Sequence, residues 1–164
     1  MRERTVKVTL ESGIGRPMNI SSKSRYALQA LVELQLRTGG DARPVRAVDL
    51  ADERRLPLPF LEQLFATLRR AGVLRSHRGA GGGFTFASAP ERVTALDIVS
   101  ALDGLPGAAS PGADGGSEPH ASAGAADVWH EADRAFAAVL AGVTIADLAE
   151  RERQSRSGQP MYQI

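Results

Sequence analysis

The chain has 164 residues, of which 43% are hydrophobic and 24% charged, a composition typical of a folded domain. No run of about eighteen apolar residues occurs, and the polar start of the chain lacks the apolar core of a signal peptide, so we expect a cytoplasmic protein that does not enter a membrane. The chain contains no cysteine, which excludes disulfides, thiolate nucleophiles and cysteine-bound zinc or iron–sulfur sites.

The net charge of +1 hides an asymmetry along the chain. Residues 18–93 carry 12 basic and 7 acidic side chains, whereas residues 94–164 carry 4 basic and 10 acidic ones. This distribution indicates that the front part of the chain meets a polyanion and that the back part does not.

The first 17 residues form an extension for which two interpretations stay open. Residues 5–10 alternate like a short strand, but Gly13, Gly15 and Pro17 interrupt the pattern. The alternative is that translation starts naturally at Met18 and that residues 1–17 do not belong to the native protein.

Three helices are predicted next. The first begins at Ser22, its N-cap, and ends before Gly39, and the second covers about residues 45–55. The third covers about residues 59–71, and Pro59 is tolerated because the N–H groups of a first helical turn have no partner within the helix. The apolar positions recur at helical spacing and predict a shared core: Ala27, Ala30, Leu31, Leu34, Leu50, Ala51, Leu61, Leu64, Phe65 and Leu68.

A β-hairpin follows the third helix. Residues 73–76 and 84–87 are typical of two short strands, and residues 77–83 form a glycine-rich turn between them. The turn is not a dinucleotide-binding motif, because Phe84 stands where the last glycine is needed and a strand follows. Three helices and a hairpin are the order of the winged helix-turn-helix fold, so we predict a mainly α-helical DNA-binding domain with a small β-hairpin wing over residues 18–104.

The rest of the chain is predicted to divide into four segments. They are a helix capped by Thr94, a flexible loop (105–126), a long dimerisation helix with a short final helix (127–150), and a polar tail (151–164). The long helix is predicted to begin at its N-cap Asp127 and to end at Gly142, and Thr144 is predicted to cap the short helix that follows.

The long helix carries a narrow apolar stripe with members at steps of three and four residues. The stripe consists of Trp129, Ala132, Phe136, Val139, Leu140 and Val143. It packs either on its own domain or against the same stripe of a second subunit, as a two-fold helix–helix seam. The flexible loop before the helix favours the seam, so we predict a homodimer.

The polar face of the third helix and the turn of the hairpin offer groups that duplex DNA requires. Gln63 can form two hydrogen bonds with adenine, Glu62 can accept one from cytosine, and an arginine at a glycine-rich tip suits a narrow minor groove. Lys23 and Arg25 are candidates for phosphate contacts. The full predicted DNA-binding set is Lys23, Arg25, Tyr26, Pro59, Glu62, Gln63, Arg70, Arg78, Gly79 and Gly81. The competing interpretation, that the arginines only form a solvated surface, stays open.

Four motifs carry a resemblance to a known family: MNISSKSRYAL at 18–28, FLEQLF at 60–65, LRRAG at 68–72 and RGAGGGF at 78–84. They resemble, in this order, the Rrf-two family of bacterial winged-helix transcriptional regulators, the family of IscR and NsrR. The resemblance implies a homodimer on a pseudopalindromic operator, with the long C-terminal helix crossing between subunits. It also implies base-recognising roles for Gln63, Glu62 and Arg78. Pro57 stands where the family usually has Ser or Thr, which removes a hydroxyl contact and implies a different operator.

Many members of this family bind an iron–sulfur cluster through three cysteines in the loop before the dimerisation helix. The corresponding loop here has none, and its candidates Asp114, Glu118 and His120 do not replace bridging thiolates. We therefore expect no cofactor. A different metal site that combines His120 and His130 with carboxylates stays open as an alternative.

The leading hypothesis is a transcriptional regulator, in particular a repressor, that binds double-stranded DNA as a homodimer and is tuned by a small molecule, a metal or a protein effector. The alternative is a winged helix that serves only protein contacts and has no operator. An enzyme is not expected, because the chain has no cysteine, no metalloprotease motif and only three scattered histidines.

Overall fold

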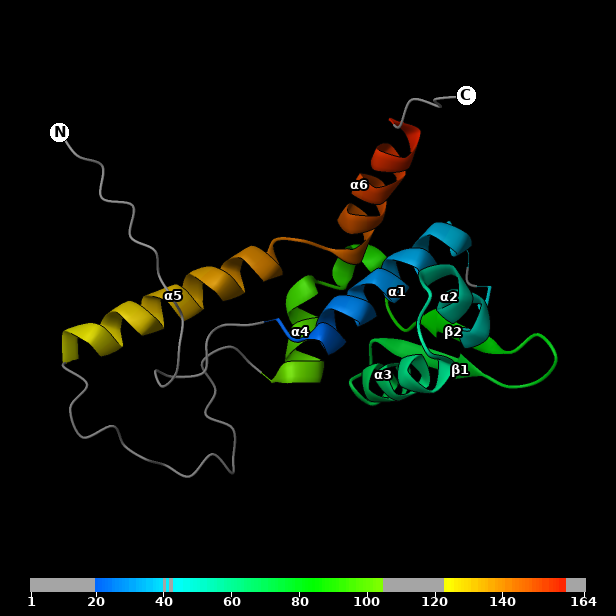
Figure 1. The fold of residues 1–164 in the computed structure, drawn as a ribbon, viewed down its shortest axis with the longest axis horizontal. Helices are drawn as coiled ribbons and strands as arrows, with labels where there is room; N and C mark the ends of the chain where they lie inside the picture. The colour runs from blue at the N-terminus through cyan, green and yellow to red at the C-terminus, as the bar shows by residue number, and fades with distance from the viewer. Residues whose placement is uncertain (1–19, 40, 42, 105–122, 159–164) are drawn as a thin grey trace.

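The computed structural model describes residues 20–39, 41, 43–104 and 123–158, and Figure 1 shows its fold. The elements in chain order are α1 (Ser22–Thr38), α2 (Ala47–Arg54), α3 (Leu58–Arg70), β1 (Leu74–His77), β2 (Gly83–Phe86), a 3-10 turn (Pro90–Arg92), α4 (Ala95–Asp103), α5 (Ala123–Ala141) and α6 (Ile145–Ser157). The prediction of a mainly helical chain with one hairpin after the third helix is confirmed. The predicted extension over residues 1–17 lies outside the described residues.

Local signals place the ends of α1 and α3. The Ser21 hydroxyl accepts a hydrogen bond from the Ser24 N–H, so Ser21 is the N-cap of α1 and the prediction of Ser22 is wrong by one residue. Gly39 ends α1 in the left-handed conformation, with φ at 58°. In α3, Pro59 lies in the first turn, as predicted.

The core forms where α1, α2, α3, α4 and α6 meet. Phe65 of α3 is fully buried and packs edge-on against Phe84 of β2, with ring centroids 5.0 Å apart. The other members include all the apolar positions predicted for the core: Ala27, Ala30, Leu31, Leu34, Leu50, Ala51, Leu61, Leu64 and Leu68. Each large side chain buried in this way stabilises the fold by about 1.5–3 kcal/mol.

The wing is fastened to the helices by a third extended segment. β1 and β2 pair antiparallel, with His77 opposite Gly83 next to the turn. The segment before α2 joins them, because Val45 and Phe84 exchange backbone hydrogen bonds of 3.0 and 2.8 Å. A Cβ at Gly83 would lie 2.4 Å from the Val45 carbonyl oxygen, so only glycine allows this approach. The wing is therefore held against the segment that leads into α2.

Thr94 and Thr144 cap α4 and α6, as predicted, and each forms a capping box with an aspartate three residues later. The two caps lie side by side, because the Ala95 N–H donates to the Val143 carbonyl and the Ile145 N–H donates to the Val93 carbonyl, both at 2.8 Å. This pairing fixes the start of α6 to the start of α4.

Helix α6 is longer than predicted. It continues to Ser157, so the prediction that the last helix ends at Glu150 and that a polar tail begins at residue 151 is wrong. The additional turns are polar and carry no apolar stripe, but α6 packs against α1 and Arg156 contacts the buried Glu33 at 3.1 Å. The ion pair of Arg156 with Glu33, together with the Glu152–Arg156 pair within the helix, therefore stabilises a segment that has no apolar stripe.

Helix α5 differs from the other helices in its surroundings. It begins at Ala123, so the predicted N-cap at Asp127 is wrong and residues 123–126, predicted as loop, are helical. It ends before Gly142, as predicted. Figure 1 shows α5 extending away from the helices around the core. Among the described residues, no helix is long and apolar enough to cross a membrane.

Candidate nucleic-acid interface

Helix α3 has one buried and one exposed side. Leu61, Leu64, Phe65 and Leu68 face the core, whereas Pro59, Glu62, Gln63 and Arg70 are exposed on the opposite side. Two hydrogen bonds order this exposed side: the Thr67 hydroxyl donates to the Gln63 carbonyl at 3.2 Å, and Arg70 donates to the Thr67 hydroxyl at 3.0 Å. The polar groups of α3 are thus presented outward by a helix whose other side is fixed.

The wing carries Arg78 at its exposed tip. Gly79 has a φ of 98°, which favours glycine, and its carbonyl accepts a 2.9 Å hydrogen bond from the Gly82 N–H that closes the turn. Arg69 of α3 donates to the Ser76 hydroxyl of β1 at 3.3 Å. Helix α3 and the wing therefore form one surface, and Figure 1 shows the hairpin turn projecting beyond the helices.

The first turn of α1 adds three exposed side chains, Lys23, Arg25 and Tyr26. The Tyr26 ring meets the Phe60 ring of α3 edge-on, with centroids 5.8 Å apart and an interplanar angle of 86°. This contact places the start of α1 beside the start of α3. All ten residues of the predicted DNA-binding set are exposed in the structure.

The basic side chains of this surface form no direct ion pairs with the carboxylates that the structure describes. By contrast, each of the following arginines pairs with an acidic side chain: Arg37 at the far end of α1, and Arg46, Arg54 and Arg156. On α1, α3 and the wing, six basic residues make no ion pair with any carboxylate that the structure describes: Lys23, Arg25, Arg69, Arg70, Arg75 and Arg78. Their positive charge is available to a polyanion.

Asp103, at the end of α4, holds the start of α1 in place. Its carboxylate accepts hydrogen bonds from the Ser21 backbone N–H at 3.1 Å, from the Ser21 hydroxyl at 2.5 Å and from the Ser24 hydroxyl at 2.7 Å. Burial alone would raise the pKa of Asp103, but these hydrogen bonds outweigh it and lower the pKa. The role of Asp103 could not be predicted from the sequence, because its partners lie about eighty positions away in the chain and no local pattern connects them.

The predicted dimerisation stripe lies along α5 and is largely uncovered. Val139 is 67% exposed, while Ala132, Phe136, Leu140 and Val143 are half-buried. The side chain of Trp129 lies outside what the structure describes. No side chain of α5 that the structure describes is buried.

Most of the residues named for the alternative metal site cannot be placed. Asp114, Glu118 and His120 lie outside the described residues, and His130 is exposed on α5. Within residues 20–39, 41, 43–104 and 123–158, no group of three or more histidine, aspartate or glutamate side chains is arranged to hold a metal ion.

A helical core that presents the polar side of one helix beside an arginine-tipped wing defines the class of winged-helix DNA-binding proteins. A family model named Rrf2 and described as an iron-dependent transcriptional regulator matches residues 20–151. The chain belongs to this family, the Rrf-two family of the sequence analysis, and is a DNA-binding transcriptional regulator.

Similar proteins agree with this assignment. A helix-turn-helix transcriptional regulator of Synechocystis sp. is 31% identical over 144 residues, which cover 87% of this chain and 95% of the relative. The structure of CymR, the global cysteine regulator of B. subtilis, has a TM-score of 0.68 and 31% identity, covering 82% of this chain and 98% of CymR. The structure of T. potens IscR has a TM-score of 0.68 and 30% identity, covering 90% and 98%. The Synechocystis relative and CymR are both described as regulators.

The family description mentions iron, but an iron–sulfur cluster does not fit the donor atoms of this chain. An iron–sulfur cluster is held mainly by cysteine thiolates, and this chain contains no cysteine. Carboxylate and imidazole groups are harder ligands than thiolate and do not replace it around a cluster. The residues of this chain therefore do not fit an iron–sulfur cluster.

Proposed function

We propose that the chain is a repressor that binds a pseudopalindromic DNA operator as a homodimer, without an iron–sulfur cluster and without catalytic activity. The observation that carries the proposal is the exposed polar side of α3, with Gln63 and Glu62, next to the arginine-tipped wing. In this proposal α3 enters the major groove, where Gln63 and Glu62 meet base edges, and Arg78 enters the adjacent minor groove. Lys23 and Arg25 hold backbone phosphates on the side where α1 begins.

The uncovered stripe on α5 supports the dimer. An exposed apolar helix face in a chain with an otherwise covered core is typical of a subunit interface. Two subunits joined along α5 would present two α3 helices related by a two-fold axis, which requires an operator with two inverted half-sites. A small molecule or protein that changes the angle between the subunits would change their fit to both half-sites, which is a route to regulation. A dimer that occupies its operator prevents other proteins from binding there, which is how it would act as a repressor. As a bacterial regulator of chromosomal DNA, the protein would act in the cytoplasm.

The salt dependence of binding tests this proposal. Each phosphate neutralised by a basic side chain contributes roughly −0.9 to the slope of log K against log salt concentration. Titration of a fluorescein-labelled duplex at several salt concentrations should therefore give a steep slope, equal to several phosphate contacts. A winged helix that serves only protein contacts would bind the duplex weakly or not at all, and this result would contradict the proposal.

A further inference from the structure

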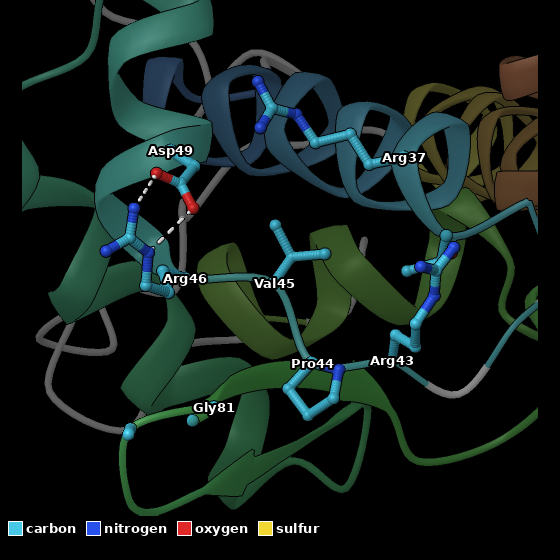
Figure 2. Close-up of a pocket in the computed structure, with 10 residues that line it drawn as sticks. Arg37, Arg43, Pro44, Val45, Arg46, Asp49 and Gly81 are labelled. Atoms are coloured by element: carbon cyan, nitrogen blue, oxygen red, sulfur yellow. Dashed lines mark hydrogen bonds and ion pairs between the residues drawn. The ribbon is translucent and has the colours of Figure 1, made fainter.

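A cleft of about 450 Å³ lies next to the wing tip, outside the predicted DNA-binding set apart from Gly81. The end of α1, the segment before α2, the first turn of α2 and the wing turn enclose it (Figure 2). Its lining consists of Arg37, Thr38, Arg43, Pro44, Val45, Arg46, Asp49, Ala80, Gly81 and Gly82. Three arginines and a single carboxylate belong to this lining, so the cleft offers several basic groups to an anion.

The three arginines differ in the ion pairs that they form with acidic side chains. Arg37 is tied to Glu33 at 3.1 Å and to Glu53 at 3.3 Å. The side chain of Arg43 is 80% exposed, and its guanidinium reaches a single carboxylate oxygen, that of Asp41, at 3.4 Å. Arg43 and Arg46 are therefore the arginines that an incoming anion would meet.

Arg46 already holds an anionic group in the geometry that suits a phosphate. Its Nε and Nη2 atoms donate to the two carboxylate oxygens of Asp49 at 2.9 and 2.7 Å, and Figure 2 shows this pair at the edge of the cleft. Arginine binds carboxylate and phosphate through the same two-pronged arrangement. The Arg46 side chain is 65% exposed and that of Asp49 33% exposed, so water screens their attraction and a phosphate oxygen can compete with Asp49 for Arg46.

The wing turn leaves the approach to these arginines open. A Cβ at Gly81 would meet no atom within 4 Å, so the fold itself does not demand glycine at this position. The lack of a side chain at Gly81 and the exposed Arg78 on the same turn give this end of the molecule room for a DNA backbone.

We propose that this cleft binds a phosphate of the DNA backbone beside the wing, with Arg46 as the main contact, Arg43 as a second contact and Asp49 as the group that the phosphate displaces. The inference rests on the proposed function and extends it. The surface that contacts DNA then reaches beyond α3 and the wing tip to the segment that joins α1 to α2.

The test measures the salt dependence of binding for Arg46→Gln and for a control, Arg151→Gln, which removes an exposed arginine of α6. The probes are a duplex selected from a random pool and a scrambled duplex of the same length. We expect Arg46→Gln to reduce the slope of log K against log salt by about 0.9 on both duplexes, because one phosphate contact is lost. The ratio of the two affinities should stay unchanged, because a phosphate contact does not depend on sequence. Arg151→Gln should leave both slopes as they are.

A second variant, Asp49→Asn, should act in the opposite direction. It frees Arg46 from its carboxylate partner and should tighten binding to both duplexes. If Asp49→Asn tightens binding by freeing Arg46, the same change should have a much smaller effect in a chain that already carries Arg46→Gln. If it acts only by removing a negative charge, the gain in affinity should be the same in both backgrounds. Circular dichroism of each variant checks that the fold is retained.

The outcomes separate this inference from the proposed function. If the unaltered chain binds neither duplex, the proposed function is wrong and the inference is wrong with it. If the unaltered chain binds and Arg46→Gln keeps the full slope, only the inference is wrong. Stabilisation by inorganic phosphate that Arg46→Gln abolishes, together with an unchanged slope on DNA, would show a small-anion site and would also overturn it.

Discussion

The apolar side chains of α3 lie against the core, whereas no side chain of α5 that the structure describes is buried. Both helices carry apolar residues at helical spacing, and both would be classed as amphipathic from the sequence. In α3 the apolar side is covered by α1, α2 and the wing, so its polar side alone is free for a ligand. In α5 the apolar side is covered only in part: Phe136 and Leu140 are half-buried, while Val128 and Val139 are 59% and 67% exposed.

This difference separates two tasks that a regulator of this class has to perform. A helix that recognises bases must be held rigidly by its own subunit, because its position decides which groups reach the groove. A helix that joins subunits completes its burial only in the assembled protein. Substitutions in α3 should therefore affect folding or DNA recognition, whereas substitutions on the apolar side of α5 should affect assembly.

Phe65→Ala should lower the stability of the fold around α3 more than any other substitution considered. The side chain is fully buried and packs on Phe84, so its removal leaves a cavity that costs about 3–5 kcal/mol of folding free energy. Urea unfolding followed by circular dichroism measures the loss. A cost below about 1 kcal/mol would show that α3 is not anchored through this residue.

Phe136→Glu should act on the assembly and leave the subunit folded. An interface anchor of this kind typically contributes about 2–4 kcal/mol to association, so sedimentation should show monomers and operator affinity should fall with them. Val139→Glu is a second variant, because a side chain that is 67% exposed in the subunit is not needed for folding. The matched control is Glu131→Gln, an exposed polar change on the same helix. Unchanged dimers in both apolar variants would rule out α5 as the main interface.

Local sequence patterns were sufficient to predict most of the helices around the core and the wing. The helical spacing of apolar residues, Gly39 and the turn glycines predicted α1, α3 and the wing to within a few residues, because these signals act over one or two turns of chain. The same patterns predicted the exposed side of α3, since it lies opposite the apolar positions. They failed for α6 beyond Glu150, where Arg156 reaches Glu33 on another helix.

The features that were missed depend on residues far apart in the sequence. Asp103 meets Ser21 and Ser24 only after α1 and α4 pack together. The cleft beside Arg46 forms only when the wing turn folds against the start of α2. Neither arrangement produces a periodic pattern in the sequence. The sequence alone therefore does not indicate which of its charged and polar side chains lie together in the fold.

Gln63→Ala tests whether the exposed side of α3 contacts a base, and its effect should be smaller than those of Phe65→Ala and Phe136→Glu. The loss of two hydrogen bonds to one base should cost about 1–3 kcal/mol of discrimination at a single operator position and should leave the salt slope unchanged. Competition between duplexes that differ at one position measures this change. An equal affinity of Gln63→Ala and the unaltered chain for every duplex would mean that Gln63 does not contact a base.

Arg78→Ala should weaken operator binding as well, with the largest loss where the minor groove beside the half-site is narrow. Duplexes with and without an A-tract at this position, titrated with both proteins, measure the effect. An undiminished affinity of Arg78→Ala for both duplexes would remove the wing tip from the interface.

Glu33→Gln should change how the free energy of unfolding depends on pH in the acid range. Burial alone would raise the pKa of Glu33, but hydrogen bonds from Arg156 and Arg37 and the charge of Arg54 outweigh it and lower the pKa. A carboxylate with a lowered pKa stabilises the fold above its unfolded value of about 4.3, and this contribution is lost as the pH falls through the folded value. The stability difference between the unaltered chain and Glu33→Gln should therefore be greatest near neutral pH and should narrow below about pH 4. Urea unfolding at several pH values measures it, with Glu150→Gln at an exposed pair as control. A difference that stays constant with pH would contradict this role of Glu33.

Selection of bound duplexes from a random DNA pool with the full chain tests most directly whether two α3 helices bind DNA as a symmetric pair. We expect one enriched motif made of two inverted half-sites, and selection with Gln63→Ala should relax the same position in both halves. Enrichment of no motif, or of a motif without two-fold symmetry, would contradict a symmetric pair of α3 helices on duplex DNA.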